Sequence, residues 1–481
     1  MKHADIRSRR AFLKGAACAG LIGIGGPGRA TSALDGVREV VSVKDFGAVS
    51  RPGRDNTAAI QAAVDAVQSR GGGVVTIPEV YECGNIVVSR DGVRFHGPGA
   101  WLVNGRITIQ NGRQGCGIEG LGIIDRRGDD RTFLLDIGGR HCTFTDVTLV
   151  KDPIAGGTMM YLGMPSSDCT FRNFTMKGSN GAFVGGSNHL IEDFVVESTM
   201  VTEIGGDDAF AIKGVNGRSE NIVIRRGRVR GCSAIVSIGS EVGTFERDSR
   251  GEAMVRNVEI TDIEAEGCEA LVYIKPGALI YDYRDGLVEG VTLADLTLTD
   301  TTGFKFAKGV HLSAGRGATI RGVTGRNLVI RARARSLGVL ETAAVDINLI
   351  ADGDPARIED VDLQVDFADP HDGARHGPAR PGHPVDYIAR IEKRDPAHGS
   401  MDDISLDITG RGSRYMGLYV GAGLDDAVRF RRARLTRVVT DPPASIGRGI
   451  WSDSRVELGD VQVEAMNNRR FGGRALQDRE P

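Results

Sequence analysis

One phrase of sequence returns many times from about residue 115 onward, and it restricts the chain to few folds. "CGIEGLGIID", "CTFTDVTLV" and "CTFRNFTMK" each place a cysteine four residues before a glycine, an aspartate or an asparagine. Related phrases such as "LIEDFVVES", "VRNVEITDI" and "RIEDVDLQV" follow. Their intervals are mostly about 20 to 37 residues, and a period in this range is typical of a solenoid.

Each phrase consists of a short alternating strand, a polar turn residue and a second alternating strand. Alternation with a period of two argues against helical repeats and predicts a parallel β-helix. Successive coils of such a fold stack about 4.8 Å apart, so equivalent positions form ladders of like residues. Cys116, Cys142 and Cys169 are expected to form one ladder of stacked, buried thiols; a disulfide between neighbouring coils is the alternative.

Composition agrees with a chain of many short strands. The 481 residues include 67 glycines without a collagen period, which indicates many tight turns. The formal net charge is −3, so the chain has no overall basic character that would indicate a nucleic-acid partner.

The stretch before the repeats, "VSVKDFGAVSRPGRDNTAAIQAAVDAVQSRGGGVVTIPEVYECG", predicts a helix that caps the solenoid. Asn56 or Thr57 can cap its N-terminus, and three consecutive glycines (71–73) end it. Its apolar face consists of Ile60, Ala63, Val64 and Val67. An amphipathic helix here would cover the open end of the β-helix core, and "VVTIPEVY" would begin the first strand.

That stretch resembles the opening of the secreted β-helix polysaccharide lyases and polygalacturonase-type hydrolases of the pectin-lyase-like superfamily. The resemblance implies a right-handed parallel β-helix. We therefore expect a cap and first coils over residues 34–114 and a β-helix over 115–481, with inserted loops at about 368–400.

Residues 1–33 are interpreted as an export signal. Arg9 and Arg10 precede "AFLKGAACAGLIGIGG", a mild apolar stretch that is too short and too glycine-rich for a stable membrane span. This pattern resembles a twin-arginine signal, with "TSA" as the cleavage site. It predicts the twin-arginine export machinery as a partner, no membrane association of the mature chain, and a periplasmic or secreted location.

The segment "EIGGDDAFAIKG" carries the strongest indication of chemistry, because Asp207 and Asp208 are adjacent carboxylates at the start of a buried strand. Two carboxyl groups are what glycosidic hydrolysis requires, one as acid and one to activate water. Mutual repulsion is one way to raise the pKa of the acid. A plain turn, in which aspartate is common, is the alternative.

About 100 residues around this segment resemble the polygalacturonase family (glycosyl hydrolases family 28). Asp207-Asp208 match its D-D motif, residues 237–241 match S-I-G-S-E, and Lys275 matches the lysine of R-I-K. The resemblance implies that Asp207 is the general acid, that Asp208 helps to activate water, and that Lys275 binds an acidic group of the substrate.

Three departures argue against strict polygalacturonase activity. The aspartate of N-T-D-G is Asn180, the histidine of G-H-G is Ala234, and the arginine of R-I-K is Tyr273. Asparagine cannot act as a general base. Glu241, with Glu203, remains a candidate in the same region.

Three functions therefore remain open: hydrolysis of a sugar other than galacturonan, β-elimination on a uronate-containing glycan with Tyr273 and Lys275, and glycan binding without catalysis. Tyr273 and Lys275 stand two residues apart on one expected strand and so share a face. The expected substrate is a polysaccharide, acidic or neutral. The histidines show no zinc spacing, so no metal and no cofactor are expected. His311 is interpreted as a satisfied strand residue.

Overall fold

A computed structural model describes most of the chain from Glu39 onward. The described residues are 39–128, 133–152, 157–178, 180–198, 208–215, 217–241, 253–277, 285–299, 308–331, 343–350, 353–368, 386–393, 398–411, 415–421, 428–439, 450–452 and 456–466. The expected export signal at 1–33 lies outside them.

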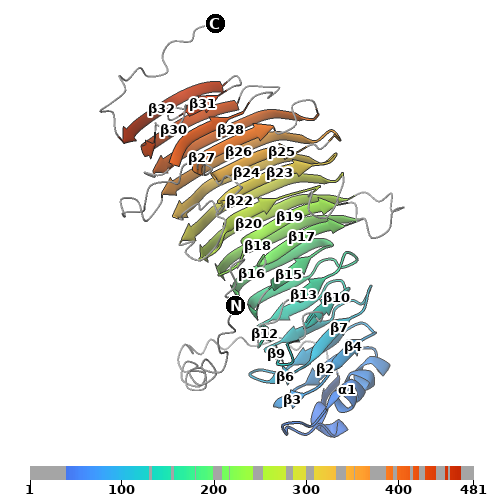
Figure 1. The fold of residues 1–481 in the computed structure, drawn as a ribbon. Coiled ribbons are helices and arrows are strands. Elements are labelled where there is room, and N and C mark those ends of the chain that lie inside the picture. The colour runs from blue at the N-terminus through green and yellow to red at the C-terminus, as the bar shows by residue number, and fades with distance from the viewer. Residues whose placement is uncertain are drawn as a thin grey trace, which may run out of the picture. The chain divides into compact units, whose positions relative to one another are not determined.

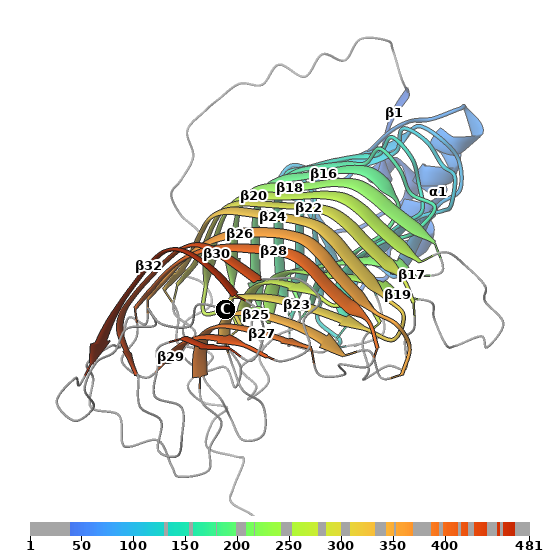
Figure 2. The same ribbon diagram turned by 90° about the horizontal axis from the view of Figure 1, so that it is seen from above.

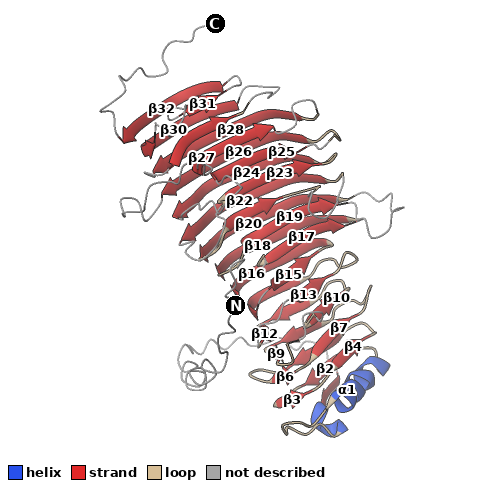
Figure 3. Ribbon diagram, in the orientation of Figure 1, coloured by secondary structure: helices blue, strands red, loops and turns tan. Residues whose placement is uncertain are grey.

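The described part is a right-handed parallel β-helix in which strands stack coil upon coil (Figure 1). Strands make up nearly all of its regular structure, and the helices lie together at the N-terminal end (Figure 3). They are the short 3-10 helix η2 (Val43–Phe46) and the helix α1 (Thr57–Ser69).

The first sheet contains nineteen of the described strands, all paired in parallel. Its early strands are β1 (Glu39–Ser42), β2 (Gly73–Thr76), β3 (Val80–Glu82), β5 (Val93–His96), β6 (Trp101–Val103), β8 (Gly117–Glu119), β9 (Gly122–Asp125), β11 (Thr143–Thr145) and β12 (Thr148–Lys151). Its long strands are β14 (Thr170–Gly178), β16 (Ser187–Ser198), β18 (Arg218–Arg230), β20 (Met254–Glu266), β22 (Leu287–Thr299), β24 (Thr319–Arg331), β26 (Arg357–Ala368), β28 (Ser400–Arg411), β30 (Val428–Val439) and β32 (Val456–Met466).

The second sheet contains thirteen described strands and faces the first across the core (Figure 2). They are β4 (Asn85–Val88), β7 (Arg106–Ile109), β10 (Leu135–Ile137), β13 (Thr158–Leu162), β15 (Asn180–Val184), β17 (Phe210–Val215), β19 (Ala234–Glu241), β21 (Ala270–Ile274), β23 (Val310–Gly315), β25 (Ala343–Ile350), β27 (Asp386–Lys393), β29 (Tyr415–Val420) and β31 (Ile450–Ser452). Strand β27 lies inside the stretch that was expected to be inserted loop.

The polar turn residue of the repeated phrase has a clear structural reason. Asp146 and Asn173 have φ values of 55° and 49°, and the equivalent Asp295 and Asn327 have 54° and 51°. This left-handed conformation favours glycine, asparagine and aspartate. It bends the strand at that residue, and Asn327 Nδ2 donates to Asp295 Oδ1 of the neighbouring coil at 2.7 Å.

The interior contains the predicted ladders. All six described cysteines are free and buried, so the prediction of buried thiols is confirmed. Cys116, Cys142 and Cys169 lie one residue before the paired positions Gly117, Thr143 and Thr170 of adjacent coils. Burial raises the pKa of Cys268 to about 12, so that thiol stays protonated.

Helix α1 buries the four apolar residues that were predicted, with Gln68 beside them. The expected side-chain cap is wrong in detail: Asn56 is the N-cap residue but makes no capping bond, and Asp55 Oδ1 instead accepts from the Thr57 backbone at 2.9 Å. Strand β1, which precedes the helix and pairs with β2, was not expected.

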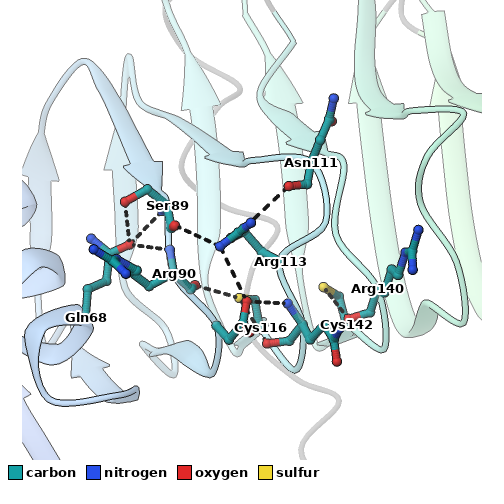
Figure 4. A network of polar contacts seen from close by, with 10 residues as sticks. Gln68, Ser89, Arg90, Asn111, Arg113, Cys116, Arg140 and Cys142 are labelled. Atoms are coloured by element: carbon teal, nitrogen blue, oxygen red, sulfur yellow. Dashed lines mark hydrogen bonds and ion pairs between the residues drawn. The ribbon is translucent and has the colours of Figure 1, made fainter.

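Gln68 attaches the helix to the first coils, as Figure 4 shows. Its Oε1 accepts from the backbone N–H groups of Ser89 and Arg90 at 2.6 and 2.9 Å. The Cys116 thiol contacts the Arg90 carbonyl at 3.5 Å. Cap and cysteine ladder therefore share one polar network. No helix among the described residues is long and apolar enough to cross a membrane.

Candidate active site

The sequence motifs that resemble the polygalacturonase pattern occupy four consecutive strands of the second sheet. Asn180 begins β15, Asp208 stands two residues before β17, Glu241 ends β19, and Lys275 directly follows β21. Asp207 lies outside the described residues, as do the side chains of Asn180 and Glu241, so their predicted roles stay predictions.

An outward-facing row crosses these strands. The pairing register connects Ala211 to Ser237, Ser237 to Tyr273, Tyr273 to His311, and His311 to Asp346. The next residues along the same strands, Ile212, Ile238 and Ile274, are fully buried in the interior. The row is thus the outer face of the solenoid at the predicted site.

Most of the outward row is nevertheless buried. Ser237 is 1% exposed, Tyr273 and His311 are each 7% exposed, and Asp346 is 0% exposed. Asp208 and Lys275 are half-buried. Charges at this site are therefore removed from bulk water, which strengthens their interactions and shifts their pKa values.

Glu269 is a residue that sequence reasoning missed. It is 6% exposed, and its Oε2 lies 3.2 Å from Ser233 Oγ and 3.4 Å from the Tyr273 hydroxyl, both of which can donate to it. Burial is the main cause that raises the pKa of Glu269 to about 7; the charge of Asp208 acts in the same direction, while Ser233, Tyr273 and Lys275 oppose the shift. Glu269 can therefore carry a proton near neutral pH.

A signal for Glu269 exists in the sequence. "GCSAIVSIG" and "GCEALVYIK" are copies of one phrase, and the register pairs Ala234 with Ala270. Glu269 consequently occupies the position of Ser233 one coil later, at the start of the strand that ends beside Lys275.

Tyr273 and Lys275 share a face, as predicted. Lys275 Nζ lies 4.3 Å from the centroid of the Tyr273 ring, a cation–π contact. Burial raises the pKa of Tyr273 well above its usual value, and the negative charges of Glu269 and Asp208 act in the same direction. The phenol therefore stays protonated and remains a hydrogen-bond donor.

His311 is a satisfied strand histidine, as interpreted from the sequence, and it also adjoins the site. Its Nδ1 lies 3.1 Å from Asp346 Oδ2, and its ring meets the Tyr273 ring edge-on at 5.7 Å. Burial lowers the pKa of His311 to about 4, so the imidazole is neutral at physiological pH.

Asp346 connects three basic side chains. Lys308 Nζ lies 2.7 Å from its Oδ2, and Arg390 Nε lies 3.0 Å from its Oδ1. Burial alone would raise its pKa, but His311, Lys308 and Arg390 hold the pKa of Asp346 well below its usual value. The carboxylate therefore holds the His311 ring in its orientation through the Nδ1 contact.

The described residues contain no group of three histidine, cysteine, aspartate or glutamate side chains placed to hold a metal ion. For proton transfer and substrate binding, the described part of the site offers the carboxyl groups of Asp208 and Glu269. Beside them lie the phenol of Tyr273, the imidazole of His311 and the ammonium groups of lysines.

Comparison with known proteins identifies the fold. No family model matches the chain, and no curated protein matches it. Among solved structures, the family 28 exopolygalacturonase of Yersinia enterocolitica is similar, with a TM-score of 0.54, 13% identity, and coverage of 90% of this chain and 79% of that one. A tailspike protein of E. coli bacteriophage HK620, solved with a pentasaccharide, has a TM-score of 0.52, 12% identity, and coverage of 87% and 78%. These matches confirm the right-handed parallel β-helix fold.

Proposed function

We propose that the outer face of the second sheet, from β15 to β23, binds a polysaccharide and cleaves its glycosidic bonds by hydrolysis. The observation that carries the proposal is the environment of Glu269. A buried carboxyl group with a pKa of about 7 stands on the same face as Asp208 and Lys275. A protonated carboxyl group near an ionised one is the pairing on which glycosidases depend.

In this proposal Glu269 protonates the leaving oxygen, and Asp208, with Asp207, activates the attacking water. Asp208 and Glu269 stand at strand starts two coils apart. Two coil steps separate their backbones by about 10 Å. Inverting glycosidases hold their carboxyl groups about 6.5 to 9.5 Å apart, a separation that side chains leaning toward each other from these backbones would reach, so we propose inversion.

This assignment differs from the one that the family resemblance implies, in which Asp207 is the acid. The difference has a physical reason. Asn180 replaces one carboxylate of the family motif, while Glu269 adds a carboxyl group with an elevated pKa. Lys275 and Tyr273 then hold the sugar, and the changed residues at 180, 234 and 273 give a substrate other than plain galacturonan.

The structural neighbours support a glycan substrate. One is described as an exopolygalacturonase and the other was solved with a pentasaccharide. We propose that this chain also acts on a glycan, which can be acidic. We further propose that the twin-arginine machinery exports it to the periplasm or out of the cell.

One observation favours β-elimination as a second candidate. Tyr273, a protonated phenol, lies between Lys275 and the neutral imidazole of His311, which Asp346 orients. In elimination, His311 would remove the proton next to a uronate carboxylate. Lys275 would neutralise that carboxylate, and Tyr273 would protonate the leaving oxygen.

The two reactions and simple binding differ in their products. The wild-type protein is incubated with polygalacturonate, alginate and neutral galactan, and the products are assayed for new reducing ends and for unsaturated uronate. Hydrolysis gives reducing ends alone, elimination gives both, and a binding module gives neither.

The substitutions Asp208→Asn and Glu269→Gln should each lower hydrolysis by about 100-fold or more, the usual contribution of a general acid or base. Glu264→Gln, an exposed residue of the first sheet, is the matched control and should keep full activity. Full hydrolysis by the Glu269→Gln variant would remove that residue from the mechanism.

A further inference from the structure

Three aromatic rings stack on the outer face of the second sheet, before the candidate active site. Phe133 and Tyr161 lie 4.9 Å apart between ring centroids, and Tyr161 and Phe183 lie 4.8 Å apart, both pairs at 25°. All three side chains are half-buried. The Arg106 guanidinium lies 6.0 Å from the Phe133 centroid and continues the stack.

Glycines give these rings their room. A Cβ at Gly163 would lie 3.2 Å from Cε1 of Tyr161, and one at Gly185 would lie 3.3 Å from Cε1 of Phe183. The Tyr161 and Phe183 rings therefore each lean over the glycine two residues further along the chain. Such an arrangement orders the rings, because a side chain at either glycine would press on them.

The stack stops at Phe183, on the row that leads into the candidate active site. The register pairs Phe183 with Ala211, Ala211 with Ser237, and Ser237 with Tyr273. Two small side chains thus separate two aromatic rings. Three coil steps place the backbones of Phe183 and Tyr273 about 14 Å apart.

Charged groups flank this short interval. Asp208 and Glu269 stand on the side where the strands begin, and Lys213 and Lys275 stand two residues beyond Ala211 and Tyr273, on the other side.

We propose that Phe183 is the wall of a sugar-binding subsite that lies over Ala211, next to the proposed cleavage site. A pyranose would lay its apolar C–H face on the Phe183 ring and direct its polar groups to Lys213 and Asp208. The plane of this pyranose is then nearly parallel to the Phe183 ring, and the sugar lies between the aromatic stack and Glu269. The subsite selects a pyranose with one face free of axial hydroxyl groups. This inference rests on the proposed function, since it names a specificity-determining residue of the same site.

The proposal is tested by a substitution that fills the subsite with a side chain. Ala211→Phe would extend the aromatic stack by one ring and occupy the space of the sugar. Phe183→Leu keeps an apolar side chain but removes the flat surface. Binding is measured by affinity electrophoresis in gels that contain polygalacturonate, alginate or neutral galactan, because this readout does not depend on cleavage. Thermal melting shows that each variant is folded.

The wild type is expected to be retarded in at least one of these gels, and Ala211→Phe to lose that retardation. Phe183→Leu should bind about 3- to 10-fold more weakly, as expected from the loss of one aromatic contact. Tyr161→Phe keeps the ring and should bind normally. Thr297→Phe, which introduces the same bulky ring on the outer face of the first sheet, is the control for size and should also bind normally.

A folded Ala211→Phe variant that binds as the wild type does would overturn the inference and leave the proposed function intact. If Ala211→Phe does not fold, Phe183→Leu decides, and unchanged binding by that variant overturns the inference. A wild type that is retarded in none of the three gels would count against the proposed function as well as the subsite.

Discussion

The raised pKa of Glu269 should appear as a pH-dependent loss of stability that Glu269→Gln abolishes. In the unfolded chain the carboxyl group titrates near its ordinary value of 4.5, and in the folded protein near 7. Between these values the native state holds a proton that the unfolded state has released. Stability therefore falls as pH rises through this window and is constant above it.

The size of the effect follows from the shift. A difference of about 2.5 pKa units corresponds to about 3 kcal/mol, at 1.36 kcal/mol per unit. Glutamine imitates the protonated acid and can still accept from Ser233 and Tyr273. The variant should match the wild type near pH 4.5 and exceed it in free energy of unfolding by about 3 kcal/mol above pH 7.

Urea denaturation at a series of pH values measures this difference directly, and it requires no knowledge of the substrate. Glu264→Gln serves as the control, because Glu264 is exposed on the first sheet, and its offset from the wild type should not grow with pH. A gap between Glu269→Gln and the wild type that stays constant from pH 4.5 to above pH 7 would refute the reasoning, since the native carboxyl would then titrate as it does in the unfolded chain.

Three further outcomes are expected. Asp346→Asn should lower the free energy of unfolding by about 3 to 5 kcal/mol in urea denaturation, because it leaves Arg390 and Lys308 without their carboxylate; a loss below about 1 kcal/mol would contradict this. Tyr273→Phe should abolish the release of unsaturated uronate if the reaction is elimination, whereas the release of reducing ends by hydrolysis should persist at a reduced rate. Replacing both Arg9 and Arg10 by lysine should keep the full-length protein in the cytoplasm in cell fractionation, and export of that variant at the normal level would refute the twin-arginine interpretation.

The features of the fold that the sequence predicted are those encoded by short spacings. The two-residue alternation predicted strands, and the Asp or Asn between them predicted a polar turn, which the left-handed bends at Asp146 and Asn173 confirm. The four apolar positions of the capping helix were also correct. Each of these depends on neighbours a few residues away, where the sequence is a direct guide.

The environment of the candidate active site could not be predicted in the same way, because it depends on contacts between coils of unequal length. Asp346 lies 35 residues after His311 and 44 residues before Arg390, so no fixed period places the three together. The proposed role of Glu269 arises from burial and from partners on other strands, which no local motif contains. The sequence did contain one indication: the repeated phrase around Ser233 and Glu269 shows that the two residues occupy equivalent positions on neighbouring coils.

The burial of the outward row is itself an argument for function. A solenoid requires apolar residues inside and asks only that the outer positions be soluble. At Ser237, Tyr273, His311 and Asp346 the outer positions are instead polar and almost completely buried. Burying polar groups costs free energy unless each is hydrogen-bonded, and an apolar row would be at least as stable. Since stability does not explain these residues, their arrangement around Glu269 is best explained by chemistry that needs a carboxyl group, a phenol and an imidazole at controlled protonation states.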